Sequence, residues 1–242
     1  MLATLRILFV YTALGPLAGL IGIPWTLLRG DITQLYNVSM WIMRAGIRAA
    51  GIRVEVTGFE NIPAGRNCIF MCNHVSNLDP PILLPLIPGR ISVLLKEELM
   101  RIPILGTAMR MGQFISVART QDIVKAKATI EAAAGALRSG LHIVVFPEGS
   151  RSEDGRLLPF KKGPFYLAKE TGAPVIPVAI SGTEKMMPTG SFRIHPGTAR
   201  IQMLPVIESE SFKTREELMA AVRSAVNAAL PPQMQNPQLD LV

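Results

Sequence analysis

The chain has 242 residues, of which 49% are hydrophobic, 6% aromatic and 18% charged. This length allows one sizeable α/β domain with an appendage, and the apolar content excludes a disordered nucleic-acid-binding tail. Lys and Arg outnumber Asp and Glu by 25 to 18, which gives a net charge of +7, but no nucleic-acid-binding motif accompanies this excess. We therefore expect the chain to meet an anionic membrane surface or an anionic substrate, and no nucleic acid.

The first segment is uncharged from Ile7 to Leu28, a run of 22 residues with Arg6 and Arg29 at its ends. A straight helix of that length, about 33 Å, could cross the hydrocarbon core of a bilayer. Prolines and glycines interrupt the run at Gly15, Pro16, Gly19, Gly22 and Pro24. Because the flanking arginines give a single span no clear inner side, we expect a shallow helical hairpin instead. The rest of the chain would then lie on the same side of the membrane as the N-terminus.

Residues 32–49 form an amphipathic pattern. Arg44 and Arg48 oppose an apolar face, with Trp41 at its boundary, and that face consists of Leu35, Val38, Ile42, Ala45 and Ala49. One interpretation is an interfacial helix whose arginines reach anionic head groups. The other is a helix packed on the protein's own core.

From residue 51 onward, strand and helix patterns alternate. The expected strands are Ile52–Thr57, Ile69–Asn73, Ile91–Leu95, Phe114–Ala118, His142–Phe146 and Val175–Ile180. The expected helices are Asp79–Leu84, Glu97–Met111, Asp122–Arg138, Gly163–Thr171 and Thr214–Leu230. Pro103 is expected to bend or split the second of them. A late hairpin is expected to join Phe192–His195 to Ala199–Pro205. This alternation predicts an α/β fold with a mostly parallel sheet flanked by helices.

Three regions follow from these patterns. Residues 1–50 form N-terminal membrane-associating helices, residues 51–230 form the main α/β domain, and residues 231–242 form a loose C-terminal tail. Cys68 and Cys72 share one face of a predicted strand and are expected to be buried thiols without a disulfide. Three scattered histidines give no pattern for a metal site, so we expect no metal.

His74 and Asp79 stand on either side of a predicted strand–turn–helix junction. On one continuous helix, residues five apart do not face each other, but a turn can fold the carboxylate back onto the imidazole. Asp79 would then hold one ring nitrogen as N–H and leave the other free as a general base. The simpler alternative is that Asp79 only caps the helix that begins with Pro80.

The segment Phe146-Pro-Glu-Gly-Ser-Arg151 follows another buried strand. Ligands of α/β sheets bind beyond the carboxyl ends of strands, where Glu148, Gly149 and Arg151 would lie. Glycine permits close approach of a substrate, and the guanidinium matches a phosphate. The alternative is an ordinary turn with a solvated arginine. Lys96 and Arg119 follow two further predicted strands and are expected at the same edge.

Four ordered blocks resemble those of the glycerolipid acyltransferases, over residues 51 to 206. They are Asn73-His74-x4-Asp79, Gly112-x-Phe-Ile-x-Val-x-Arg119, Phe146-Pro-Glu-Gly-Ser-Arg151 and Val175-Ile-Pro-Val178. The resemblance is strongest to the bacterial enzymes that acylate 1-acylglycerol-3-phosphate.

This resemblance implies transfer of a fatty acyl group from acyl-CoA or acyl carrier protein to the sn-2 hydroxyl of lysophosphatidic acid. The product would be phosphatidic acid, an intermediate of phospholipid biosynthesis, made at the cytoplasmic face of the inner membrane without a cofactor beyond the acyl donor. The resemblance makes His74 the base and Asp79 its partner. It makes substrate contacts of Lys96, Gly112, Arg119, Glu148, Gly149 and Arg151.

Other functions remain open. The same family chemistry could act on another lysolipid or acyl acceptor, and a catalytically idle membrane adaptor would need no base. A serine hydrolase is disfavoured because the chain has no Gly-x-Ser-x-Gly nucleophile elbow.

Overall fold

The computed structural model describes residues 1–117 and 123–238, and within them seven strands form one sheet in the order β1-β7-β6-β2-β5-β3-β4. The strands are β1 (Ile52–Thr57), β2 (Ile69–Cys72), β3 (Ile91–Lys96), β4 (Ile115–Val117), β5 (His142–Val145), β6 (Val175–Ser181) and β7 (Gly197–Met203). Strands β6, β2, β5, β3 and β4 run parallel, whereas β7 is antiparallel to β6 and β1 is parallel to β7. The predicted α/β fold with a mostly parallel sheet is confirmed.

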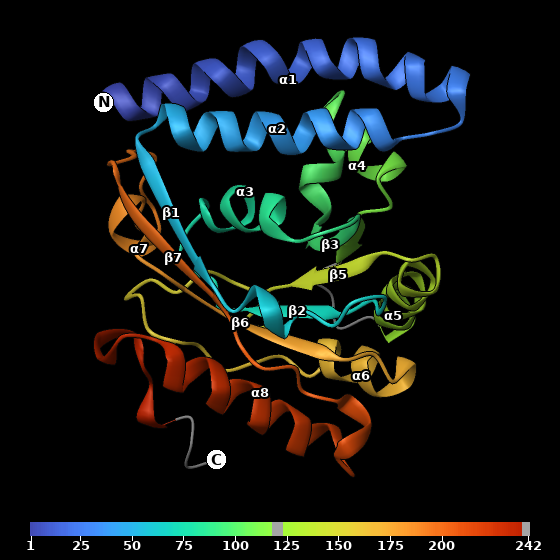
Figure 1. The fold of residues 1–242 in the computed structure, drawn as a ribbon, viewed down its shortest axis with the longest axis vertical. Helices are drawn as coiled ribbons and strands as arrows, with labels where there is room; N and C mark the ends of the chain where they lie inside the picture. Colours follow the sequence, from blue (N-terminus) through green and yellow to red (C-terminus); the bar gives the residue numbers. More distant parts are fainter. Residues whose placement is uncertain (118–122, 239–242) are drawn as a thin grey trace.

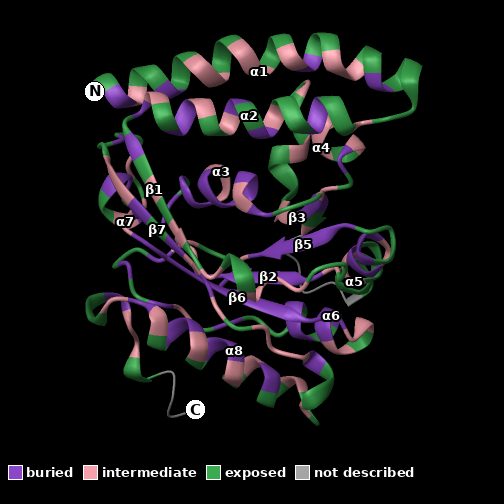
Figure 2. Cartoon of the chain, viewed as in Figure 1, coloured by how far each residue is buried: buried purple, intermediate pink, exposed green. Residues whose placement is uncertain are grey.

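Helices cover both faces of this sheet (Figure 1). They are α1 (Leu2–Arg29), α2 (Thr33–Ala49), α3 (Asp79–Leu83), α4 (Leu105–Met111), α5 (Ile123–Arg138), α6 (Gly163–Thr171), α7 (Thr183–Met186) and α8 (Arg215–Ala229). Helices α1 to α4 lie on one face, and α5, α6 and α8 on the other. Each face of the sheet has its own hydrophobic core, and alternate residues of β2 pack into each. Phe70 and Cys72 belong to the core on the side of α1 to α4, and Ile69 and Met71 to the core on the other side. Buried residues accordingly line the sheet in Figure 2, and Cys68 and Cys72 are free thiols, as expected.

Helix α1 is continuous, so the expected interruption at Pro16 and Pro24 is wrong. Proline removes a hydrogen bond from a helix interior, but α1 packs along α2 over its length and tertiary packing supplies most helical stability. Small residues bring the two helices close together. A Cβ on Gly46 would lie 2.2 Å from a ring carbon of Tyr11, and the Tyr11 hydroxyl donates to the Met43 carbonyl at 3.3 Å. The hairpin is therefore formed by α1 and α2, not within residues 7–28.

Both halves of α1 contact the α/β domain. Near its start, Thr4 Oγ1 accepts a hydrogen bond from the Ile194 backbone N–H at 2.9 Å. In its second half, Gly19 abuts the side chain of Ile104, which precedes α4. Helix α1 therefore lies along the domain and does not project from it.

The outward side of α1 is apolar and uncovered. Its exposed large side chains are Leu2, Leu5, Leu8, Phe9, Leu17, Leu20, Ile21, Trp25, Leu27 and Leu28. By length and composition, α1 could also cross a membrane.

Helix α2 lies between α1 and the domain, so its buried face is wider than the sequence suggested. Tyr36, Met40 and Ile47 belong to the core, whereas Val38 and Trp41 are 43% and 56% exposed. Packing on the protein's own core is the alternative that describes α2, and the expected apolar face is wrong at Val38.

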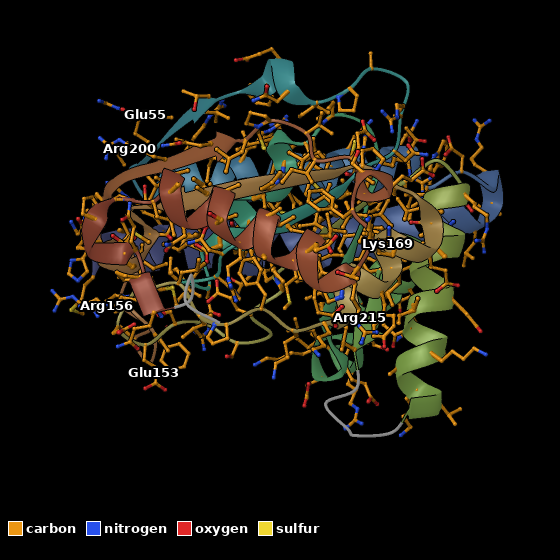
Figure 3. The ribbon with its side chains drawn as sticks, turned by 90° about the horizontal axis from the view of Figure 1, so that it is seen from below. Glu55, Glu153, Arg156, Lys169, Arg200 and Arg215 are labelled. Carbon is orange, nitrogen blue, oxygen red and sulfur yellow. The ribbon has the colours of Figure 1, made fainter. Side chains whose placement is uncertain are left out.

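The late hairpin is also wrong. Residues 192–195 form no strand, and Gly197, expected in the turn, begins β7. Strand β7 instead pairs with β6 and β1, and Arg200 of β7 reaches Glu55 of β1 at 3.0 Å (Figure 3). With a strand on each side, β7 can hydrogen-bond its backbone N–H and C=O groups along both edges, whereas a strand of an isolated two-stranded hairpin pairs along only one.

One smaller expectation is confirmed and another changes. The predicted helix Glu97–Met111 is split at Pro103 into a 3-10 turn, Glu97–Arg101, and α4, as expected. The expected loose tail does not hold for residues 231–236. Met234 is 2% exposed and its carbonyl accepts from the Leu157 N–H, so apolar burial fixes the chain there.

Candidate active site

The candidate site lies at the carboxyl edge of the parallel strands. Thr183 follows β6, His74 follows β2, Glu148 follows β5 and Lys96 ends β3, in the spatial order of those strands. Parallel strands bring their carboxyl ends to one edge, so residues distant in sequence converge there.

The predicted contact between His74 and Asp79 is present. Nδ1 of His74 lies 2.8 Å from Oδ2 of Asp79, which is fully buried. The same oxygen accepts from the backbone N–H groups of Val75 and Ser76 at 2.8 Å each. Asp79 therefore closes the turn before α3, and among the described residues its Oδ2 accepts from that turn and not from the backbone of α3. Because an ionised carboxylate only accepts, Nδ1 carries the hydrogen and Nε2 is left as the basic nitrogen.

Two further contacts hold His74 in place. The imidazole stacks on the ring of Phe146, with 4.2 Å between ring centroids, and the backbone carbonyl of His74 accepts from the Ser152 N–H at 2.9 Å. The side chain is 18% exposed. A ring that is fixed in orientation but open to solvent on one side suits a base that must meet a substrate.

Glu148 holds the backbone of His74. Its Oε1 accepts from the His74 N–H at 2.7 Å and its Oε2 accepts from the Leu158 N–H at 3.1 Å. The residue is 2% exposed. Burial raises the pKa of Glu148 to about 8, although the two N–H donors act in the opposite direction. Both oxygens are thus directed at backbone donors, and the acceptor contact expected of Glu148 stays a prediction.

The turn after β5 supplies an open, partly charged surface. Gly149 has φ +73°, a left-handed conformation that favours glycine. Arg151 is half-buried and lines a cavity of about 440 Å³ with Ser150, Glu153, Asp154 and Leu158. Figure 3 shows Glu153 at the outer surface of this loop. Arg151 immediately precedes Ser152, whose backbone N–H donates to the His74 carbonyl, so this turn is joined to the His74 turn.

The remaining predicted residues are spread more widely. Lys96 is exposed at the end of β3, two strands from β2. Gly112 is buried and ends α4. Arg119 lies outside the described residues. Among the residues that are described, no group of three His, Cys, Asp or Glu side chains is placed to hold a metal.

Two functional contacts were missed by the sequence reasoning. The Thr183 hydroxyl donates to Asp79 Oδ1 at 2.6 Å. Asn73 exchanges two hydrogen bonds with the backbone of Ile180, at 2.7 and 2.9 Å, and so joins the end of β2 to β6. A polar residue just after a buried strand was the available signal for Thr183, as it was for His74.

Comparison with known proteins gives a consistent result. A family model described as Acyltransferase matches residues 53–181. The chain is 30% identical over 196 residues to a 1-acyl-sn-glycerol-3-phosphate acyltransferase of Limnanthes alba, covering 78% of this chain and 66% of that protein. It is 31% identical over 183 residues to the human beta form, covering 75% and 66%. The chain thus spans just under two thirds of the length of these curated relatives.

A solved structure is similar over almost the whole chain. It is the crystal structure of the 1-acyl-sn-glycerophosphate (LPA) acyltransferase PlsC from Thermotoga maritima, with a TM-score of 0.79 and 29% sequence identity. The match covers 93% of this chain and 92% of that one. Since the family model spans more than half of the chain and includes both the His74–Asp79 pair and Arg151, this protein belongs to the acyltransferase family.

Proposed function

We propose that the protein transfers a fatty acyl group from a CoA or carrier-protein thioester to the sn-2 hydroxyl of 1-acylglycerol-3-phosphate. The observation that carries this proposal is the contact between His74 and the buried carboxylate of Asp79. The names of the relatives found by sequence and by structure support the choice of acceptor. The product is phosphatidic acid.

The reaction needs one base and no covalent enzyme intermediate. Nε2 of His74 takes the proton of the acceptor hydroxyl as its oxygen forms a bond to the thioester carbonyl carbon. The carbon–sulfur bond then breaks, and the proton passes from the imidazolium to the leaving thiolate. Asp79 stabilises the imidazolium during the transfer because its Oδ2 faces Nδ1.

The acceptor phosphate is assigned to the basic side chains of the same edge. Arg151 presents a planar guanidinium in the cavity after β5, and such a fork binds a phosphate through two parallel hydrogen bonds. Lys96, and Arg119 in the stretch outside the described residues, are the further candidates from the sequence.

We also assign the outward face of α1 to the membrane. Its leucines, isoleucine and aromatic side chains are exposed, and exposed apolar side chains of this kind can enter the interface between head groups and acyl chains. Because both halves of α1 contact the domain, the helix would lie in the membrane plane. The donor's carrier is cytosolic, so the surface in question is the cytoplasmic face of the inner membrane.

Acceptor competition tests the proposal. Lysophosphatidic acid, a neutral lysolipid and a zwitterionic lysolipid are offered together with one acyl donor, and the phosphomonoester should be acylated preferentially. The preference should fall in Arg151→Ala and return only partly in Arg151→Lys, because an ammonium cannot reproduce the two-pronged contact. Equal acylation of all three lipids by the wild type would contradict lysophosphatidic acid as the preferred acceptor and would favour another acceptor of the same reaction. A wild-type protein without acyl transfer would favour the membrane adaptor.

A further inference from the structure

The connection between β6 and β7, residues 182–196, contacts the His74 turn and the loop after β5 at three points. The Thr183 hydroxyl donates to Asp79, the Met187 carbonyl accepts from the Ser76 hydroxyl at 2.8 Å, and the Thr189 hydroxyl donates to the Ser152 carbonyl at 2.7 Å. Near the end of the connection, the Ile194 backbone N–H donates to the Thr4 hydroxyl of α1. None of these connection residues belongs to the four sequence blocks.

Thr183 makes the contact nearest to the chemistry. Both Thr183 and Asp79 are fully buried, and Oγ1 lies 2.6 Å from Oδ1. From the described residues, Oδ2 of Asp79 receives three hydrogen bonds, from His74, Val75 and Ser76. The Oδ1 atom receives a hydrogen bond from the Thr183 hydroxyl. The hydroxyl therefore faces the one carboxylate oxygen that the His74 turn does not engage.

We propose that Thr183 is a positioning residue for the base, acting through Asp79. A carboxylate held at one oxygen can rotate about its Cβ–Cγ bond and share its donors between the two oxygens. With Oδ1 fixed by Thr183, Oδ2 stays directed at Nδ1, and the imidazole keeps Nε2 facing the substrate. Without the hydroxyl, Oδ1 is a buried charged acceptor that lacks a donor, and rotation that recovers a donor disturbs the His74 contact.

This inference rests on the proposed acyl transfer and predicts a specific kinetic pattern. Thr183→Val, which keeps the shape of the side chain but removes the donor, should lower kcat on the order of ten- to a hundredfold. The KM of the acceptor should stay unchanged, since Thr183 is fully buried and presents no surface to the acceptor. Thr183→Ser should restore most of kcat, because the hydroxyl is restored.

The matched control is Thr26→Val in α1. Thr26 is also buried, but its hydroxyl has no hydrogen-bond partner among the residues that the structure describes, so kcat and KM should both stay at the wild-type values. If Thr183→Val kept wild-type kcat, or if Thr183→Ser were as impaired as Thr183→Val, the positioning role would be overturned.

A double-mutant cycle guards against a variant that is merely less well folded. In an Asp79→Ala background, where Thr183 has no carboxylate to act through, adding Thr183→Val should lower kcat little further. A full, additive loss of kcat in that background would overturn the inference. Wild-type protein with no acyl transfer at all would instead refute the proposed function, so the two failures are distinguishable.

Discussion

Asp79 accepts hydrogen bonds at both of its oxygens, and this arrangement sets the expected ranking of active-site variants. His74→Ala removes the base and should abolish nearly all acyl transfer, since general-base catalysis contributes about a hundred- to ten-thousandfold. Asp79→Asn should cost less. Its amide oxygen can take the Oδ2 donors and its NH2 group can donate to the Thr183 hydroxyl, so the base stays in place while the stabilising charge is lost. Turnover numbers of the purified variants check this ranking, and near-normal turnover of His74→Ala would contradict the mechanism.

The second residue-scale prediction concerns Glu148 and pH. Burial raises the pKa of Glu148 from 4.5 to about 8 in the folded protein, so the folded state binds this proton more tightly than the unfolded state does. The stabilisation from protonated Glu148 is then fully present below about pH 4.5 and is lost as pH rises through about 8. We expect the free energy of unfolding to fall over this window in the wild type relative to Glu148→Gln, which carries no titratable group.

Denaturant unfolding of both proteins at several pH values across that window measures the difference. A constant difference between them would show that Glu148 titrates at an ordinary pKa. Gln at this position also turns its NH2 group toward one of two backbone donors, from His74 and Leu158. We therefore expect Glu148→Gln to be the less stable protein at the acidic end.

Local sequence predicts part of this site and leaves the rest undetermined. The His74–Asp79 contact spans five residues and follows from a turn between a strand and a helix. Glu148 and Thr183 contact the same turn from 74 and 104 residues away. Those contacts depend on β5 and β6 both neighbouring β2, and the order of strands in a sheet is not encoded in any short segment.

At the scale of elements, the hairpin of α1 and α2 depends on small residues. A Cβ at Gly46 would lie 2.2 Å from the Tyr11 ring, so Gly46→Ala should separate the helices and destabilise the protein by about 1–3 kcal/mol. Thermal unfolding measures this effect. The matched control is Gly135→Ala in α5, where an added Cβ meets nothing within 4 Å and should stabilise the helix by about 0.5–1 kcal/mol. Equal shifts in the two variants would contradict close packing at Gly46.

The elements also show where periodicity is a reliable guide. Buried strands such as β5 and the amphipathic α8 were predicted within one or two residues, because burial on a fixed face produces the pattern directly. The continuity of α1 through Pro16 and Pro24 was not predicted, since the contacts that stabilise this helix come from α2. The late hairpin failed for a similar reason, because residues 199–203 alternate as a strand without revealing which strands they pair with.

At the scale of the whole molecule, the structure determines how the membrane surface should be tested. Deleting residues 1–50 would remove α2, whose Tyr36 and Met40 belong to the core, so loss of activity would be ambiguous. Replacing the outward-facing Leu17, Leu20 and Leu28 by Ser leaves the core intact, since all three are more than half exposed.

This triple variant should sediment less with anionic vesicles than the wild type. Its activity should fall more on bilayer-embedded acceptor than on a short-chain, soluble analogue, because only the first requires docking. The control is Val124→Ser, an equally exposed apolar residue of α5 on the opposite face of the sheet. Unchanged vesicle binding of the triple variant would exclude the α1 surface as the membrane contact.

The uncovered side of α1 also determines which concentration of acceptor sets the rate of this protein. Helix α1 has 28 residues and is about 42 Å long, so a molecule seated along it samples lipids by lateral diffusion in two dimensions. Its turnover would then follow the mole fraction of acceptor in the leaflet and not the amount of acceptor per volume of cell. Dilution of the acceptor by inert lipid would slow the protein even when the total amount of acceptor is constant, and growth of the membrane would itself lower the rate of product formation.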